Sequence, residues 1–313
     1  MPSTTAVPSR PSTPAAAHPA ADRTRTAERL LASAARTSFD PQIDIDWSAP
    51  PVPGLWYAPP ERSTLYGTAL WERMSDDQRI ELTKHEVASI ASVGIWFETI
   101  LTQMLVRSLY DRSMTDAHAR FAFTEIADEC RHSMMFGRMI ETLGCPDYGP
   151  GRLAHVLGRP FKSLSNPTLT FAGALYVEEI LDALQREAMA DDRVQPLVRA
   201  VSRIHVIEEA RHMRYARDET ARQVAELGRV ERVSSRLVLG VVAAMSTARL
   251  VHPGVYASVG LDEREARAAA KNNPYWAATR RFAARKAVDF FTDQGLITPS
   301  ERRLFWRRYG LVT

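Results

Sequence analysis

Two short segments of this 313-residue sequence carry side chains that could do chemistry. They read Asp-Glu-Cys-Arg-His and Glu-Glu-Ala-Arg-His, and in each a glutamate stands three residues before a histidine. Residues i and i+3 lie on one face of a helix, so the carboxylate and the imidazole can bind the same ion. We therefore interpret the segments as metal-binding pairs, Glu129 with His132 and Glu209 with His212.

The repetition of the whole pattern makes these pairs more than a chance match. Each segment reads acid, Glu, small residue, Arg, His, and the second lies 80 positions after the first. The outer acids, Asp128 and Glu208, are candidates to accept the second ring N–H of a histidine and so fix its tautomer. The arginines, Arg131 and Arg211, are candidates to balance the buried acids.

A metal site in a four-helix bundle also needs one glutamate from each of the other two helices. Glu98 and Glu178 lie among apolar residues of the expected first and third long helices, where an unpaired carboxylate is costly. Glu98 precedes Glu129 by 31 residues, and Glu178 precedes Glu209 by the same spacing. The duplication thus extends to six groups, although Glu179 competes with Glu178 for this role.

Four carboxylates and two imidazoles form a donor set typical of two hard divalent ions with open positions for oxygen. Iron is the first choice and manganese the second, while zinc fits less well. Cys130, beside Glu129, is better explained as a packed thiol than as a ligand. The sequence therefore predicts a di-iron centre.

The duplication fails at one position. One turn before Glu209, on the same helix face, stands a further histidine, His205. The first half has Glu125 at the equivalent place, and the role of Glu125 stays open. His205 is either a third ligand on this helix or a histidine bonded to a carbonyl group or to solvent.

With His205, the sequence resembles the ferritin-like di-iron arylamine N-oxygenases, typified by p-aminobenzoate N-oxygenase, over about residues 60–295. The resemblance implies that two ferrous ions activate O₂ and oxidise an amine through hydroxylamine and nitroso to nitro, in small-molecule biosynthesis. It implies a separate electron-donor protein or reductant and a homodimer, and it names no catalytic residue beyond the metal site. The implied iron ligands are Glu98, Glu129, His132, Glu178, His205, Glu209 and His212.

The substrate is less well defined by the sequence. In the p-aminobenzoate enzymes, polar and cationic groups hold the substrate carboxylate. Here Arg281 and Arg285, with Arg280 beside them, are candidate anchors, and a solvated surface explains each of them equally well. An arylamine, an aliphatic amine, a heterocycle and a carrier-bound amine all stay open.

Two other functions fit the same motifs. A di-iron site of this kind could hydroxylate or desaturate carbon, and the seven residues would serve that chemistry too. A non-enzymatic, ferritin-like iron-binding protein is the third hypothesis. It is less favoured, because a 313-residue chain with a long tail is an awkward subunit for a storage cage.

The elements that must position these groups are four long helices. Helical spacing, caps and Pro or Gly punctuation predict an all-α fold, a ferritin-like four-helix bundle with additional flanking helices. A Pro-rich stretch, residues 41–60, is expected to lie as a strap against the body. The predicted helices cover residues 76–110, 115–143, 167–190 and 193–227, then 230–250, 262–271, 275–294 and 299–308.

The expected domain organisation is simple. Residues 1–40 are predicted to form a flexible N-terminal tail with a short helix near residues 24–36. Residues 41–313 are predicted to form one helical di-iron domain, whose bundle core spans about residues 75–228.

Composition narrows the class of protein. With 45% hydrophobic and 25% charged residues, the chain matches ordinary globular proteins. The net charge of +3 is small, so no nucleic-acid partner is expected. The longest apolar runs fall short of a membrane span. Two cysteines are too few for a disulfide framework and agree with a cytoplasmic location.

Overall fold

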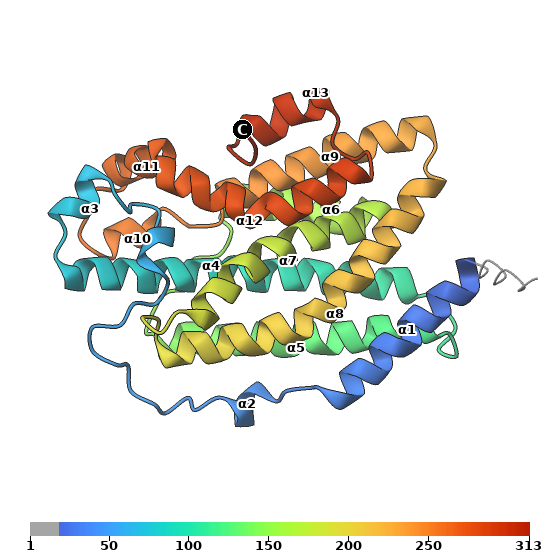
Figure 1. Ribbon diagram of the computed structural model, residues 1–313, viewed down its shortest axis with the longest axis horizontal. Helices are drawn as coiled ribbons and strands as arrows, with labels where there is room; N and C mark the ends of the chain where they lie inside the picture. The colour runs from blue at the N-terminus through green and yellow to red at the C-terminus, as the bar shows by residue number, and fades with distance from the viewer. Residues whose placement is uncertain (1–18) are drawn as a thin grey trace, which may run out of the picture.

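The computed structural model describes residues 19–313, and within that range the chain is helical (Figure 1). Among these residues the only β-type pairing is an isolated bridge between Trp56 and Val194. The predicted all-α class is confirmed. Residues 1–18, the first part of the predicted tail, lie outside the described residues.

Four long helices form the centre of the fold: α4 (Asp76–Leu109), α5 (Ala117–Thr142), α7 (Pro167–Ala190) and α8 (Pro196–Glu226). Their starts follow the capping residues in the sequence. Ser75 and Gln78 form a capping box on α4, and the Asn166 side chain accepts the Leu169 N–H at the start of α7. The predicted boundaries of these helices agree with the structure within about three residues.

The four helices pack as two hairpins. α4 packs along α5, α7 packs along α8, and contacts of α4 with α7 and of α5 with α8 close the bundle. The interior of this bundle contains most of the buried acids and histidines of the chain. A ferritin-like four-helix bundle is therefore the architecture that holds the duplicated motifs.

By length and composition alone, α4 could cross a membrane. However, 56% of its most apolar window is buried inside the protein. Its buried face also includes the acids Glu86 and Glu98. α4 is thus explained as the central helix of the bundle.

The short helix predicted near residues 24–36 is present in the N-terminal segment. α1 (Pro19–Arg36) covers these residues and packs against α5 and α8 (Figure 1). The Arg23 Nε is 2.8 Å from Glu219 Oε1. Ala27 and Ala34 are buried against the bundle, so this helix lies on the body of the protein.

The predicted strap is confirmed. It contains α2 (Pro41–Asp44) and leads to η1 (Pro60–Arg62) and α3 (Ala69–Arg73). The Trp56 N–H donates to the Arg193 carbonyl, and the Gln195 N–H donates to the Trp56 carbonyl, each at 2.8 Å. These bonds join the strap to the turn between α7 and α8.

Additional helices surround the bundle: α6 (Arg152–Leu164), α9 (Arg229–Ala248), α10 (Gly254–Ala257), α11 (Glu263–Asn272), α12 (Pro274–Asp293), α13 (Pro299–Glu301) and the π-helical η2 (Arg302–Arg307). Helices α9 and α12 pack on α7. The sequence did not predict α6, which begins after Gly151 at φ 79° and includes Pro160. Such residues usually mark loops, so the local pattern argued against a helix.

Candidate metal centre

The structure brings all seven predicted ligands together in the middle of the bundle. Each is at most 3% exposed. Their donor atoms form three overlapping groups, and within each group the atoms lie within 4.8 Å of one another. The groups are Glu98–His132–His205, Glu129–Glu209–His212 and Glu178–His205–Glu209.

The two Glu-x-x-His pairs face each other across the bundle. His132 Nδ1 lies 3.2 Å from Glu129 Oε2 and 3.2 Å from Glu209 Oε1. His212 Nδ1 lies 3.0 Å from Glu209 Oε1 and 3.1 Å from Glu129 Oε1. Each histidine thus presents Nδ1 to both central glutamates, so these four residues would together hold the metal ions.

The outer ring nitrogens bind carboxylates from the opposite half of the duplication. His132 Nε2 lies 2.9 Å from Glu208 Oε2, and His212 Nε2 lies 3.2 Å from Asp128 Oδ2. An Nε2–H donated to a carboxylate leaves Nδ1 with a free lone pair for a metal. Asp128 and Glu208 therefore have the orienting geometry expected from the sequence, with their partners exchanged between the halves.

The motif arginines hold these outer carboxylates. Arg131 donates to Asp128, and the Arg211 Nη2 lies 3.3 Å from Asp128 Oδ2 and 3.7 Å from Glu208 Oε1. The segment after α1 completes the arrangement. The Phe39 N–H donates to Glu208 Oε1 at 3.1 Å, and Arg211 Nη1 donates to the Thr37 carbonyl at 3.1 Å.

His205 lies inside the centre. Its Nε2 is 3.4 Å from Glu98 Oε1 and 3.8 Å from Glu209 Oε1, and its ring centroid is 4.6 Å from that of His132. Burial lowers the pKa of His205 to about 3, and the electrostatic effect of the nearby His132 is the second cause. A neutral imidazole is the form that can bind a metal.

The glutamates carry unsatisfied oxygens. Glu98 Oε2, Glu178 Oε2 and Glu209 Oε2 are buried and have no hydrogen-bond partner among the described residues. Burial and the neighbouring glutamates raise the pKa values of Glu98 and Glu178 well above the usual range. Such orphaned oxygens are costly unless a cation binds them, so the site fits the pair of divalent ions predicted from the sequence.

The choice between two adjacent acids is clear in the structure. Glu178 lies in a ligand group, whereas Glu179 bonds to Arg217. Glu125, the counterpart of His205, is 3% exposed but belongs to none of the three groups formed by described residues. Its Oε2 has no hydrogen-bond partner within residues 19–313, and burial raises its pKa well above the usual range.

The predicted substrate anchors lie elsewhere. Arg281 and Arg285 are on α12, and Arg285 is exposed. Neither arginine is among the described residues that line the cavity near the metal centre.

Comparison with known proteins adds the family to this geometry. Residues 20–295 match the family of the p-aminobenzoate N-oxygenase AurF. The chain belongs to this family. The seven clustered residues and the bundle that holds them lie within the matched range.

Individual relatives carry no assigned function. The chain is 30% identical over 210 residues to Uncharacterized protein Mb0909 of Mycobacterium bovis and to Uncharacterized protein Rv0885 of Mycobacterium tuberculosis. The match covers 65% of this chain and 62% of each relative. The chain thus spans less than two thirds of the length of these relatives.

Sequence reasoning missed the cavity near the metal centre and the contact of Phe39 with Glu208. Phe136 follows His132 by four residues, and its ring centroid lies 4.9 Å from that of His205. Ser202 precedes His205 by three residues and lines the same cavity as Phe136. Helical spacing from the ligands could have found both. Phe39 left no such signal, because its contact with Glu208 spans 169 residues.

Proposed function

We propose that this protein is a non-haem di-iron N-oxygenase that oxidises a small-molecule amine. The observation that carries the proposal is His205, a third histidine held against Glu98 and Glu209 inside the duplicated site. Membership of the p-aminobenzoate N-oxygenase family supports the same reaction class. Glu98, Glu129, His132, Glu178, His205, Glu209 and His212 would hold two iron ions, with manganese as the alternative metal.

Charge balance supports this metal set. Four ionised glutamates carry four negative charges, which two divalent cations neutralise in a water-poor interior. Asp128 and Glu208 form a second layer of negative charge that orients His212 and His132. Arg131 and Arg211 offset these two acids.

When bound, the two ferrous ions would supply the activation of O₂. The seven ligands would hold the ions, and Glu208 and Asp128 would orient His132 and His212 through Nε2, so that each Nδ1 is directed at the metal position. The apolar bundle interior excludes water from the reacting nitrogen. We propose that electrons come from a separate donor protein or reductant and that the protein works as a cytoplasmic homodimer.

The decisive experiment combines metal analysis with product analysis. Protein reconstituted with ferrous iron should contain about two ions per chain. After reduction and exposure to O₂, it should convert an arylamine to hydroxylamine, nitroso or nitro products, identified by mass spectrometry. Iron-loaded protein that places oxygen on carbon would favour a hydroxylase, and protein that turns over no amine in a broad panel would contradict the proposal.

A further inference from the structure

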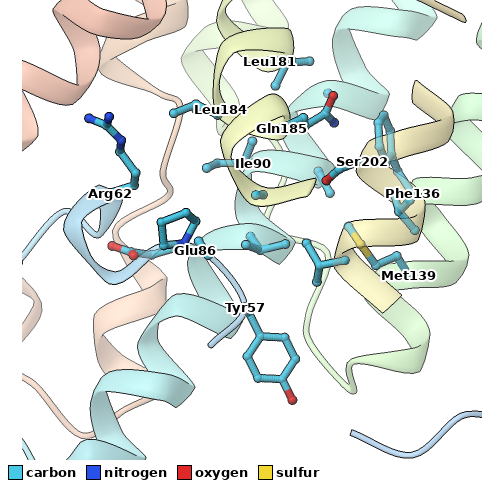
Figure 2. Close-up of a pocket in the computed structure, with 18 of the residues that line it drawn as sticks. Tyr57, Arg62, Glu86, Ile90, Phe136, Met139, Leu181, Leu184, Gln185 and Ser202 are labelled. Atoms are coloured by element: carbon cyan, nitrogen blue, oxygen red, sulfur yellow. The ribbon is translucent and has the colours of Figure 1, made fainter. Parts of the chain in front are cut away.

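A cavity of about 80 Å³ lies between the four bundle helices and the strap (Figure 2). All four helices line it within about one turn of a candidate ligand. The positions are Gly94, four before Glu98; Phe136, four after His132; Leu181, three after Glu178; and Ser202, three before His205. The cavity therefore lies about one helical turn from the candidate ligands, toward one end of the bundle, and none of the seven ligands is among its described lining residues.

The size of the cavity limits its occupant. Apolar cavities of roughly 150 Å³ bind a benzene molecule. At about 80 Å³ the cavity has about half that volume, so no more than one ring could enter, and only if wall side chains move outward. Its walls are mostly aliphatic and aromatic, with Ile90, Phe136 and Leu184 among them.

Two polar side chains interrupt this apolar wall near Phe136. Gln185 on α7 and Ser202 on α8 both reach into the cavity (Figure 2). The Gln185 Oε1 is buried and has no hydrogen-bond partner among residues 19–313. Ser202 is 3% exposed. A buried amide oxygen without a partner costs free energy, which a ligand that donates a hydrogen bond to it would recover.

The charged groups of the cavity wall are already engaged. Among the described residues of the cavity wall, Arg62 is the one cation. Its Nε and Nη2 donate to the two carboxylate oxygens of Glu187 at 2.6 and 2.7 Å. Its guanidinium also stacks on the Phe282 ring and points away from Phe136 (Figure 2). Glu86 accepts hydrogen bonds from the backbone and the hydroxyl of Thr64.

We propose that Gln185 and Ser202 bind an uncharged hydrogen-bonding substituent, a carboxamide or a hydroxyl, on a single-ring aromatic amine. This inference rests on the proposed function, because it treats the cavity as the substrate site. A carboxylate placed there would lose its hydration without gaining a free cation and would lie in a cavity that also holds Glu86. The protein therefore prefers uncharged arylamines to aminobenzoates.

The spacing along the helices agrees with this placement. Gln185 lies seven residues after Glu178, about 10 Å along the helix at 1.5 Å per residue. Ser202 lies seven residues before Glu209, the residue grouped with Glu178, which is also about 10 Å along α8 by the same measure. A ring with substituents at opposite ends can place one at Gln185 and direct its amine toward the metal ligands.

The test compares two ligands of nearly the same shape. Iron(II)-loaded protein, kept free of O₂, is titrated calorimetrically with 4-aminobenzamide and with 4-aminobenzoate. We expect the amide to bind at least about ten-fold more tightly. Equal affinity, tighter binding of 4-aminobenzoate, or binding of neither compound would overturn the inference.

Variants test the two named residues. Gln185→Leu keeps the approximate size of the side chain. This variant should bind 4-aminobenzamide about ten-fold more weakly, and its affinity for aniline should be unchanged because aniline lacks the second polar group. Ser202→Ala should also weaken the binding of 4-aminobenzamide, by a smaller factor. Loss of aniline binding in step with the amide would instead indicate a general packing effect and overturn the assignment.

These measurements distinguish a failure of the cavity assignment from a failure of the proposed function. If the amide binds more tightly but no N-oxidised product forms on reduction and exposure to O₂, the cavity assignment stands and N-oxygenation fails. If 4-aminobenzoate is both bound more tightly and N-oxidised, N-oxygenation stands and this inference fails.

Discussion

The two halves of the metal centre, α4–α5 and α7–α8, match at every position but one. The same 80-residue offset relates Glu98 to Glu178, Glu129 to Glu209 and His132 to His212. The unmatched pair is Glu125 and His205. His205 belongs to two ligand groups, whereas Glu125 belongs to none.

The matched and the unmatched positions of the metal centre have different roles. The matched residues provide a symmetric cage for two ions, a feature common to many di-iron proteins. The unmatched histidine adds a nitrogen donor on one side only, so the two ions would have unequal surroundings. We therefore expect the matched positions to control metal binding and the unmatched position to control which chemistry follows.

The largest expected effect comes from the matched central glutamates. Glu129→Gln and Glu209→Gln should each reduce iron from about two ions per chain to near zero, because each carboxylate faces both histidines. The measurement is iron content of the refolded, reconstituted variants. Glu179→Gln is the matched control, since this buried acid bonds to Arg217 and should leave iron content unchanged. A loss of one ion only would show that the central carboxylates do not bridge.

The unmatched pair should respond unequally. His205→Ala should lose about one of two ions, because His205 faces Glu98 and Glu209, while Glu125→Ala should retain both. Iron content and the absorption spectrum measure the two variants side by side. An equal loss of iron from the two variants would contradict the assignment of His205, and not Glu125, as a metal ligand.

A symmetrising substitution sharpens the same contrast. His205→Glu makes the second half repeat the first, with a glutamate in both places. We expect this variant to keep most of its iron, since carboxylates also bind it, but to lose N-oxygenation by at least about ten-fold. Product formation per bound iron is the measurement. Unchanged N-oxygenation would show that His205 does not determine the chemistry.

A smaller effect is expected from the outer acids. Asp128→Asn and Glu208→Gln should each weaken iron binding about 10- to 100-fold, because each removes the carboxylate that orients a histidine. Competition with a chelator measures the affinity. Since the partners are exchanged between the halves, Asp128→Asn should disturb the signal of His212, and Glu208→Gln that of His132, in NMR spectra of the metal-free protein. The opposite assignment would contradict the crossed arrangement.

The smallest effect concerns the stability of metal-free protein. Burial raises the pKa of Glu125, so the folded state keeps a proton that the unfolded state releases above its ordinary pKa. Stability therefore falls as pH rises above the ordinary range for a glutamate. Glu125→Gln should be more stable than the wild type at pH 8 by about 1 kcal/mol, with the difference vanishing near pH 4. Urea unfolding at both pH values measures this, and a difference that grows toward pH 4 would contradict it.

Much of the fold was predictable from local patterns. The four long helices follow from caps such as Ser75 and Asn166 and from apolar spacing, which act within a few residues. The flanking helix α6 was missed, because Gly151 and Pro160 normally mark loops. Its position against α4 is a tertiary contact that the local pattern does not contain.

Some features of the site could be assigned only from the tertiary structure. The sequence left Glu178 and Glu179 as alternatives, and they separate only because Arg217 on α8 takes Glu179. It also placed Asp128 and Glu208 beside the ligands without showing which histidine each one orients. Arg281 and Arg285 were suggested by the family resemblance, and the fold places them on α12, outside the lining of the cavity.

The sequence by itself determined the helices, the duplicated Glu-x-x-His pairs and the unmatched His205. These features depend on spacings within one helix or on a repeat along the chain, and helix geometry converts such spacings into a shared face. Only the tertiary structure decided the crossed histidine–carboxylate bonds and the polar pair of Gln185 and Ser202 in the cavity. Those features depend on how far each helix is rotated and how closely it approaches its neighbours, which packing across the whole bundle determines.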